Sequence, residues 1–113
     1  IKFTGWKNKD EVKQYMKGAR ALIFPSRWYE GAPLTPLEAM QYGIPCLVSN
    51  VSSAIDYIEN NGRIFKLNSE CFKKEIEIYE RNINEYSEKA YEYLKRIKKI
   101  SYFEEITSFY EEI

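Results

Sequence analysis

The chain has 113 residues, which is the size of one domain. A content of 44% hydrophobic and 16% aromatic residues suits a folded domain with one core and excludes a disordered chain. The 17 basic and 17 acidic residues leave no net charge, which argues against a protein that binds nucleic acid or an anionic membrane through excess positive charge. We therefore expect no nucleic-acid partner.

The first part of the chain, residues 1–68, alternates short apolar runs with helical patterns, and this predicts a parallel sheet with flanking helices. Four strands are expected, at residues 1–4, 21–24, 46–48 and 63–67. Pro25 ends the second strand and Pro45 opens the third, because proline lacks the backbone N–H of a regular strand. An Asn-Asn-Gly turn at residues 60–62 precedes the fourth.

The first predicted helix covers residues 9–17. Asn8 is placed as its N-cap, with Glu11 three positions further on. One face of this helix is apolar and carries Val12, Tyr15, Met16 and Ala19.

Two further helix starts are marked by capping patterns. Thr35 is predicted to be an N-cap, followed by proline at the first helical position and by Glu38 at the capping-box position. Gly43 is expected to end this helix in the left-handed conformation. Ser53 is expected to cap a short helix in the same way, with Asp56 as its capping-box partner.

The second part of the chain, residues 69–113, is predicted to be helical and is rich in glutamate, lysine and tyrosine. Three apolar stripes at helical spacing are expected to face the core or a neighbouring domain. They are Phe72, Ile76, Tyr79 and Ile83; Tyr86, Ala90, Tyr93, Leu94 and Ile97; and Phe103, Ile106, Phe109, Tyr110 and Ile113.

Metal chemistry is not expected of this chain. It has no histidine, the commonest metal ligand and general base. Cys46 lies in an apolar run, so a buried thiol is favoured over a disulfide or a metal ligand, and Cys71 forms no CxxC pair with it. The two aspartates, Asp10 and Asp56, form no Asp-x-Asp motif that could hold a metal beside a diphosphate. We expect neither a metal nor another cofactor, and a metal site outside this chain stays open.

The loop at residues 25–34 is the richest candidate for a binding site. Ligands of open parallel sheets bind outside the carboxyl ends of the strands, and this loop follows the second predicted strand. It places Glu30 beside Gly31 just before a predicted helix start. Such a start offers free backbone N–H groups and a partial positive charge, which suit a phosphate group.

Five short motifs follow one another in this part of the chain. They are Phe-Pro-Ser at 24–26, Glu-Gly-Ala-Pro-Leu at 30–34, Leu-Glu-Ala-Met at 37–40, Gly-Ile-Pro at 43–45 and Asn-Gly at 61–62. This ordered pattern resembles the donor site of the retaining GT-B glycosyltransferases, specifically glycosyltransferase family 4. The family has two glutamates separated by seven residues, here Glu30 and Glu38. Other glutamate pairs of this chain share that spacing, but only this pair lies on a strand–loop–helix junction.

The resemblance implies a role for each residue of the loop. Glu30 would be the catalytic-site carboxylate that contacts hydroxyls of the donor sugar, and Glu38 would accept hydrogen bonds from the ribose hydroxyls of the nucleotide. Backbone N–H groups around Gly31, Ala32 and Leu34 would help to hold the diphosphate. Pro33 lies in the same turn but has no N–H to donate.

The resemblance also implies a fold and a reaction. Residues 1–68 would form the distal part of a Rossmann-like nucleotide-sugar-binding domain, which belongs to a GT-B C-terminal domain, and residues 69–113 would form its C-terminal helices. The parent enzyme would transfer a hexosyl group from a nucleotide diphosphate sugar to an acceptor, with retention of configuration, in polysaccharide biosynthesis. We expect a cytoplasmic protein, and peripheral attachment to the inner face of the membrane stays open.

Part of the implied site lies outside this chain. The basic residues that grip the diphosphate and the acceptor-binding N-terminal domain would precede residue 1, so we expect no sugar transfer by the chain alone. In the family's strand order two further strands would separate residues 1–4 from 21–24. Without them we expect self-association through the unpaired edge of 21–24, or a repositioned N-terminal strand. Ser52 and Ser53 replace the family's glycine-rich turn, so that loop should approach a ligand less closely.

Other interpretations of these residues stay open. Glu38 could serve only the capping box, and Glu30 could be a solvated loop residue. The aromatic residues Trp6, Trp28 and Tyr29 could be packing groups, and Arg27 could be a surface residue.

Two other classes of function also stay open. One is a nucleotide-sugar epimerase or a phosphorylase-like enzyme on the same scaffold, and the other is a non-catalytic α/β interaction module. Binding of UDP or GDP would separate the last of these from the enzymes.

Overall fold

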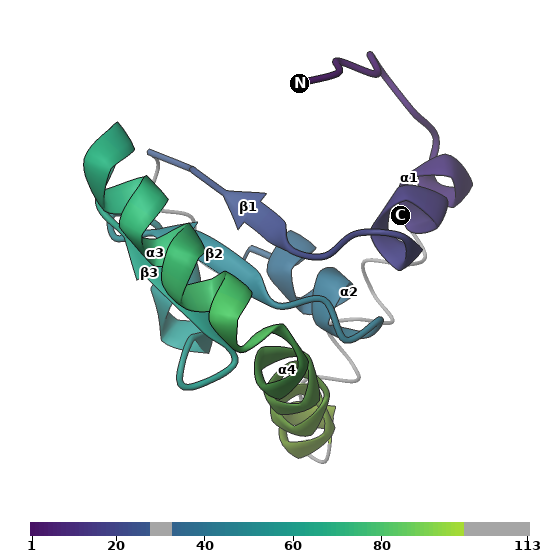
Figure 1. Ribbon diagram of the computed structural model, residues 1–113. Helices are drawn as coiled ribbons and strands as arrows, with labels where there is room; N and C mark the ends of the chain where they lie inside the picture. Colours follow the sequence, from purple (N-terminus) through teal and green to yellow (C-terminus); the bar gives the residue numbers. More distant parts are fainter. Residues whose placement is uncertain (28–32, 99–113) are drawn as a thin grey trace.

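The computed structural model describes residues 1–27 and 33–98 and contains a three-stranded parallel sheet (Figure 1). Its strands are β1 (Leu22–Phe24), β2 (Cys46–Ser49) and β3 (Gly62–Phe65), in the order β1-β2-β3. Every residue of β2 is buried, as its unbroken apolar run predicts for the central strand of a parallel sheet.

Helices cover both faces of this sheet. Helices α2 (Thr35–Met40), η1 (a 3₁₀ helix, Ser53–Tyr57) and α4 (Ile83–Lys98) pack on one face and α3 (Ser69–Arg81) packs on the other. Helix α1 (Lys9–Lys17) precedes β1 and buries none of its residues. Cys46 and Val48 point into a core shared with α2 and α4, whereas Leu47, between them, packs in a second core beneath α3. The prediction of an α/β fold, a Rossmann-like parallel sheet with flanking helices and a helical C-terminal part, is confirmed.

The predicted strand at residues 1–4 is wrong. These residues have no regular secondary structure and are exposed, with Ile1 and Phe3 at 117% and 93% of full exposure. They lie away from β1, as Figure 1 shows at the end marked N. The physical reason is that a strand needs a partner for its backbone N–H and C=O groups. In the described residues β1 pairs with β2 alone, so residues 1–4 join no ladder and the sheet has three strands instead of four.

Helix α1 has the predicted bounds and the predicted cap. The side chain of Asn8 accepts a hydrogen bond of 2.9 Å from the backbone N–H of Glu11. The carboxylate of Glu11 forms an ion pair with Lys7 at 3.5 Å. The helix buries none of its residues, and Tyr15 on its apolar face is 53% exposed. Of the four apolar positions predicted for this face, Ala19 packs against the core, whereas Val12 and Tyr15 are exposed.

The predicted capping box at the start of α2 is wrong, and the predicted glycine at its end is confirmed. Leu34 is the N-cap, with helical backbone angles and no side-chain bond, so Thr35 is already inside the helix. A side chain caps a helix from a residue with an extended backbone. Thr35 is a helical residue, so its hydroxyl does not cap α2 and the capping box with Glu38 does not form. Gly43 has φ of +68° and its N–H donates to the carbonyl of Met40 at 3.0 Å, which is half of a Schellman motif.

The cap of η1 lies one residue earlier than predicted. The hydroxyl of Ser52, not that of Ser53, accepts the N–H of Ala54 at 3.0 Å. Ser53 is the first helical residue and is buried, so the predicted capping box between Ser53 and Asp56 is wrong as well. The reason is again local: Ser52 has the extended backbone that a cap requires.

The turn before β3 depends on Asn61 and Gly62. Asn61 is fully buried, and its side-chain amide accepts from the N–H of Glu59 and donates to the carbonyl of Tyr57. A Cβ atom at Gly62 would lie 2.1 Å from the carbonyl oxygen of Cys46 on β2. Glycine is required there because the strands approach so closely, and β3 therefore includes Gly62 rather than starting after it.

The apolar stripes of the C-terminal helices pack as predicted where the structure describes them. Phe72, Ile76 and Tyr79 pack with Leu47 and Phe65 under α3. In the second stripe, Tyr86 packs in the same cluster against Tyr79. The rest of this stripe covers the opposite face, where the buried residues of the core include Ala90, Tyr93 and Leu94. The third predicted stripe, from residue 103 onward, lies outside the described residues.

Candidate functional site

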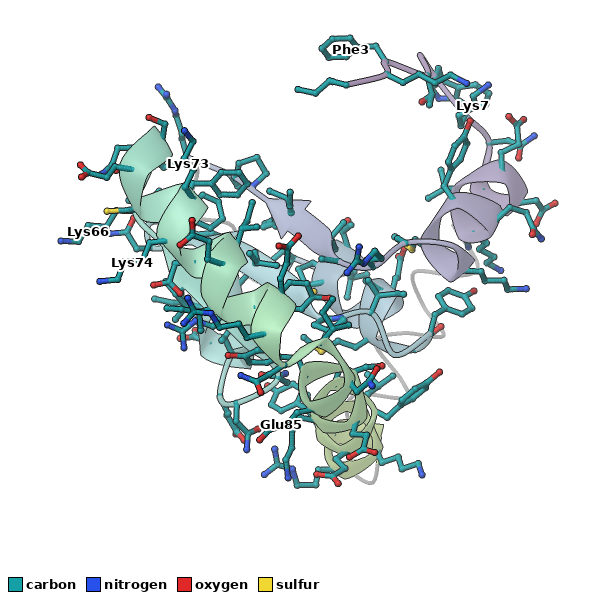
Figure 2. All side chains as sticks on the ribbon, in the orientation of Figure 1. Phe3, Lys7, Lys66, Lys73, Lys74 and Glu85 are labelled. Carbon is teal, nitrogen blue, oxygen red and sulfur yellow. The ribbon has the colours of Figure 1, made fainter. Side chains whose placement is uncertain are left out.

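The three strands end together at one edge of the sheet, because they are parallel. Residues 25–27 follow β1, 50–53 follow β2 and 66–68 follow β3. Three lysines lie around the last of these ends and point outward (Figure 2): Lys66, Lys73 and Lys74. This is the edge at which open parallel sheets bind ligands, and its lysines favour an anionic one.

The loop between β1 and α2 is described only at its two ends. The predicted site residues Glu30, Gly31 and Ala32 lie outside the described residues, as do Trp28 and Tyr29. Before the gap, Arg27 is exposed. After it, Pro33 is buried and Leu34 packs against the core.

Glu38 is the predicted site residue that the structure places most clearly. It lies in the first turn of α2, a helix whose buried residues are Pro36, Leu37, Ala39 and Met40. Its own side chain is exposed and makes no hydrogen bond or ion pair with any residue in the described ranges. Because the capping box does not form, the alternative that Glu38 serves only as a cap is wrong, and its carboxylate is open to solvent.

A hydrogen bond between side chain and backbone joins two of the strand ends. The hydroxyl of Ser49, the last residue of β2, donates to the carbonyl oxygen of Ser26 at 2.5 Å. Ser49 is fully buried. Ser49 belongs to none of the sequence motifs described above, although a polar residue that closes a buried apolar strand is an unusual feature.

The two serines that replace the glycine-rich turn do not project from this edge. Ser52 and Ser53 are 1% and 3% exposed. The hydroxyl of Ser52 accepts a hydrogen bond from the N–H of Ala54 in η1, and the side chains of both serines are buried.

Two cavities of the described part of the chain lie away from the loop between β1 and α2. One, of about 140 Å³, runs beside β1 and is lined by Ile23, Leu47, Ile76 and Tyr79 among others. A larger one, of about 620 Å³, lies where α3 meets α4 and contains the opposed charges of Arg81 and Glu85. The larger cavity has a size typical of ligand sites, but it lies at the opposite end of the strands from Glu38.

Neither a reactive thiol at Cys46 nor a cluster of metal-binding side chains is present in the described residues. Burial raises the pKa of Cys46 to about 12, so its thiol stays protonated at neutral pH and cannot act as a nucleophile. Both Cys46 and Cys71 are free, which confirms the predicted buried thiol. Within residues 1–27 and 33–98 no three side chains of the metal-binding types lie together. In the same ranges no helix is both long and apolar enough to cross a membrane.

Comparison with known proteins identifies relatives of this chain. It is 36% identical over 66 residues to a UDP-Gal:alpha-D-GlcNAc-diphosphoundecaprenol alpha-1,3-galactosyltransferase of Escherichia coli, an overlap that covers 57% of this chain and 16% of that protein. It is 45% identical over 51 residues to a lipopolysaccharide 1,6-galactosyltransferase of Salmonella typhimurium, covering 43% of this chain and 14% of that protein. An O-antigen chain mannosyltransferase B of Escherichia coli is 33% identical over 64 residues, covering 57% and 16%.

These relatives are much longer than the region they share with this chain, which spans at most 16% of the length of each. The match to a protein family is more extensive. Residues 1–102 match the family described as glycosyl transferases group 1, and this range includes the sheet, the helices on both its faces and the loop between β1 and α2. The chain therefore belongs to the group 1 glycosyl transferases.

Proposed function

We propose that this chain forms part of the nucleotide-sugar site of a glycosyltransferase. The intact protein would transfer a hexosyl group from a nucleotide diphosphate sugar to an acceptor, with retention of configuration. Membership of the glycosyl transferases supports the reaction class. The observation that carries the donor-site assignment is Glu38, an exposed carboxylate without a partner in the described residues, on the helix that follows the carboxyl end of β1.

Glu38 is proposed to bind the ribose of the nucleotide. An ionised carboxylate accepts hydrogen bonds and donates none, and its two oxygens can receive two vicinal hydroxyl groups. The four buried neighbours of Glu38 fix α2 against the core, so the carboxylate is presented from a rigid element. A rigid support lowers the entropy lost on binding.

Glu30 is proposed to contact the hydroxyls of the donor sugar, eight residues before Glu38 in the sequence. Backbone N–H groups of Gly31, Ala32 and Leu34 would bind the diphosphate between the two glutamates. Glycine at position 31 suits this role because the absence of a side chain lets a ligand approach the backbone. No metal is invoked in this proposal.

The remaining parts of the site are proposed to lie outside this chain. Transfer requires the donor and the acceptor to be held together, and the chain provides one side of the donor site. We propose that another domain of the intact protein binds the acceptor and that basic residues outside this chain neutralise the diphosphate. The chain alone is then expected to show no transfer.

The names of the relatives suggest which substrates to test first. Two of them are galactosyltransferases and one is a mannosyltransferase, and the Escherichia coli galactosyltransferase acts on a diphosphoundecaprenol-linked sugar. We propose that the intact protein uses a nucleotide-activated hexose to build a cell-surface polysaccharide at the cytoplasmic side of the membrane.

A transfer assay tests this proposal. The intact protein is incubated with radiolabelled UDP-galactose or GDP-mannose and with a polyprenyl-diphosphate-linked sugar as acceptor. We expect labelled acceptor whose new bond keeps the anomeric configuration of the donor. Glu30→Gln should abolish this transfer, whereas Glu85→Gln, a change in the first turn of α4 (Figure 2), should not. Conversion or hydrolysis of the donor with no transfer to any acceptor would contradict the proposal.

A further inference from the structure

The end of β3 and the second turn of α3 carry three exposed lysines. Lys66 follows β3 directly, and Lys73 and Lys74 lie in the second turn of α3. All three point outward (Figure 2), and their side chains make no ion pair or hydrogen bond within the described part of the chain. Residues 66–74 contain these three lysines and a single carboxylate, that of Glu70, so the segment has a net charge of +2.

Two exposed apolar side chains lie at the same edge of the sheet. Leu67 comes directly after Lys66 and is 39% exposed, and Val51, in the turn after β2, is 44% exposed. The backbone joins the two strand ends, because the N–H of Asn50 donates to the carbonyl oxygen of Phe65 at 2.9 Å. Exposed apolar groups beside charged residues mark surfaces that contact proteins or membranes.

Helix α3 supports this surface across the sheet from Glu38. The rings of Phe65 and Phe72 meet edge to face with their centroids 5.0 Å apart, which fixes the first turn of α3 to the end of β3. Helix α3 packs on one face of the sheet, and α2, which carries Glu38, packs on the other. The two helical lysines therefore lie on a rigid element, away from the carboxylate that is proposed to bind the ribose.

We propose that the surface formed by Lys66, Leu67, Lys73 and Lys74, with Val51 at its border, contacts an anionic membrane. Charge complementarity selects this partner, since each lysine near an anionic lipid surface strengthens binding about fivefold. The two aliphatic side chains suit the boundary between head groups and acyl chains. Surfaces that bind single-stranded nucleic acid add aromatic side chains on which bases stack, whereas the exposed residues of this lysine surface are cationic or aliphatic.

The inference rests on the proposed function in one respect, namely that a lipid-linked acceptor is found at a membrane. The chain as a whole has no net charge, so its attraction to anionic lipid depends on where the lysines lie. Contact through the lysine surface would hold the carboxyl edge of the sheet close to the lipid that carries the acceptor. Binding to lipid requires neither donor nor transfer, and it can therefore be measured by itself.

Sedimentation of the intact protein with lipid vesicles tests this contact. Vesicles of phosphatidylcholine alone are compared with vesicles of equal parts phosphatidylcholine and phosphatidylglycerol. The wild type should bind the anionic vesicles more tightly, and added salt should weaken this binding because it screens the charges. A variant that combines Lys66→Gln, Lys73→Gln and Lys74→Gln should bind the anionic vesicles on the order of a hundredfold more weakly. Its melting temperature should match the wild type, because the replaced side chains are exposed.

A matched control separates the lysine surface from the overall charge. Lys9 and Lys13 on α1 and Lys95 on α4 are also exposed and make no ion pair in the described residues. Replacing these three by glutamine changes the net charge of the protein by the same amount. Vesicle binding by the control should stay within about fivefold of the wild type, because charges beyond about 10 Å from the lipid are largely screened. Equal losses in the two triple variants overturn the inference.

Nucleotide titration separates the membrane from the phosphates of the donor. The Kd for UDP and GDP should be the same, within about twofold, in the wild type and in the variant of the lysine surface, since the lysines are assigned to lipid. Weaker nucleotide binding with unchanged vesicle binding would assign these lysines to the diphosphate and overturn the inference. A wild type that does not bind anionic vesicles, or that binds RNA in their place, overturns it as well. A wild type that binds the vesicles through these lysines but neither nucleotide supports the inference and overturns the proposed function.

Discussion

Replacing Glu38 with alanine is the sharpest test of a single residue in this protein. The side chain is exposed in the first turn of α2 and makes no hydrogen bond or ion pair with another described residue. Its removal therefore breaks no hydrogen bond or ion pair within residues 1–27 and 33–98. We expect the free energy of unfolding to stay within about 0.5 kcal/mol of the wild-type value, as for most surface substitutions.

The expected effect on nucleotide binding is much larger. A hydrogen bond to a charged group contributes roughly 1.5–3 kcal/mol. Loss of one such bond between Glu38 and a ribose hydroxyl should weaken binding by about ten- to a hundredfold. Because the ribose belongs to the nucleotide, free UDP or GDP should be affected as strongly as the nucleotide sugar.

Calorimetric titration of the intact protein with UDP, GDP and the nucleotide sugar measures this effect, and melting curves measure stability. Glu85→Ala is the matched control: it removes an exposed glutamate from the first turn of α4, at the other end of the molecule. Binding by this variant should match the wild type. If Glu38→Ala binds the nucleotide as tightly as the wild type does, the assignment of Glu38 to the ribose is refuted.

Three further predictions concern other residues. Glu30→Ala should leave nucleotide affinity nearly unchanged and depress turnover or sugar selectivity in a transfer assay; equal losses of affinity in Glu30→Ala and Glu38→Ala would contradict the separate roles. Gly43→Ala should lower the unfolding free energy by more than the roughly 1–2 kcal/mol of a left-handed backbone, because its Cβ would lie 2.1 Å from the ring of Tyr91. Denaturant titration in a Tyr91→Ala background should show a smaller loss, and strictly additive losses would contradict this contact. Burial raises the pKa of Cys46 from 9.0 to about 12, so the folded state keeps a proton that the unfolded chain releases. Stability should therefore be unaffected below about pH 9 and fall between about pH 9 and 12, and Cys46→Ala should show a smaller fall over that window than the wild type.

The elements of this fold could be predicted from sequence where one local rule decides them. The helix at residues 9–17 is such a case, because Asn8 offers its start a cap that the structure uses. The central strand is another, because an apolar run bounded by proline leaves few alternatives. The left-handed glycine at position 43 follows from backbone sterics alone.

The errors arose where the outcome depends on partners that sequence does not show. Residues 1–4 have the composition of a strand, but they lie away from the open edge of β1 (Figure 1) and pair with no strand of the described residues. In both wrong capping boxes the observed N-cap, Leu34 or Ser52, lies one residue before the predicted one. The backbone angles of the chain decide which residue is the cap, and the sequence does not show them. Helix ends are uncertain by that amount in general.

The residues of the candidate site could be proposed from the sequence, but their arrangement in space could be predicted only in part. The motif order placed Glu38 in the first turn of a helix, and the structure puts it there with an exposed side chain. The bond from Ser49 to Ser26 could not be foreseen, because it depends on which strand end lies beside the loop. Glu30 lies outside the described residues, so its role stays a prediction.

The central claim is that the carboxyl edge of this sheet binds the nucleotide of a sugar donor. The most direct measurement follows the backbone amide resonances of the intact protein in NMR spectra during titration with UDP and with GDP. The account predicts saturable shifts in residues 26–40 and 50–53, with no change around residues 81–85 at the opposite end. Saturable shifts confined to residues 81–85, or none with either nucleotide, would contradict it.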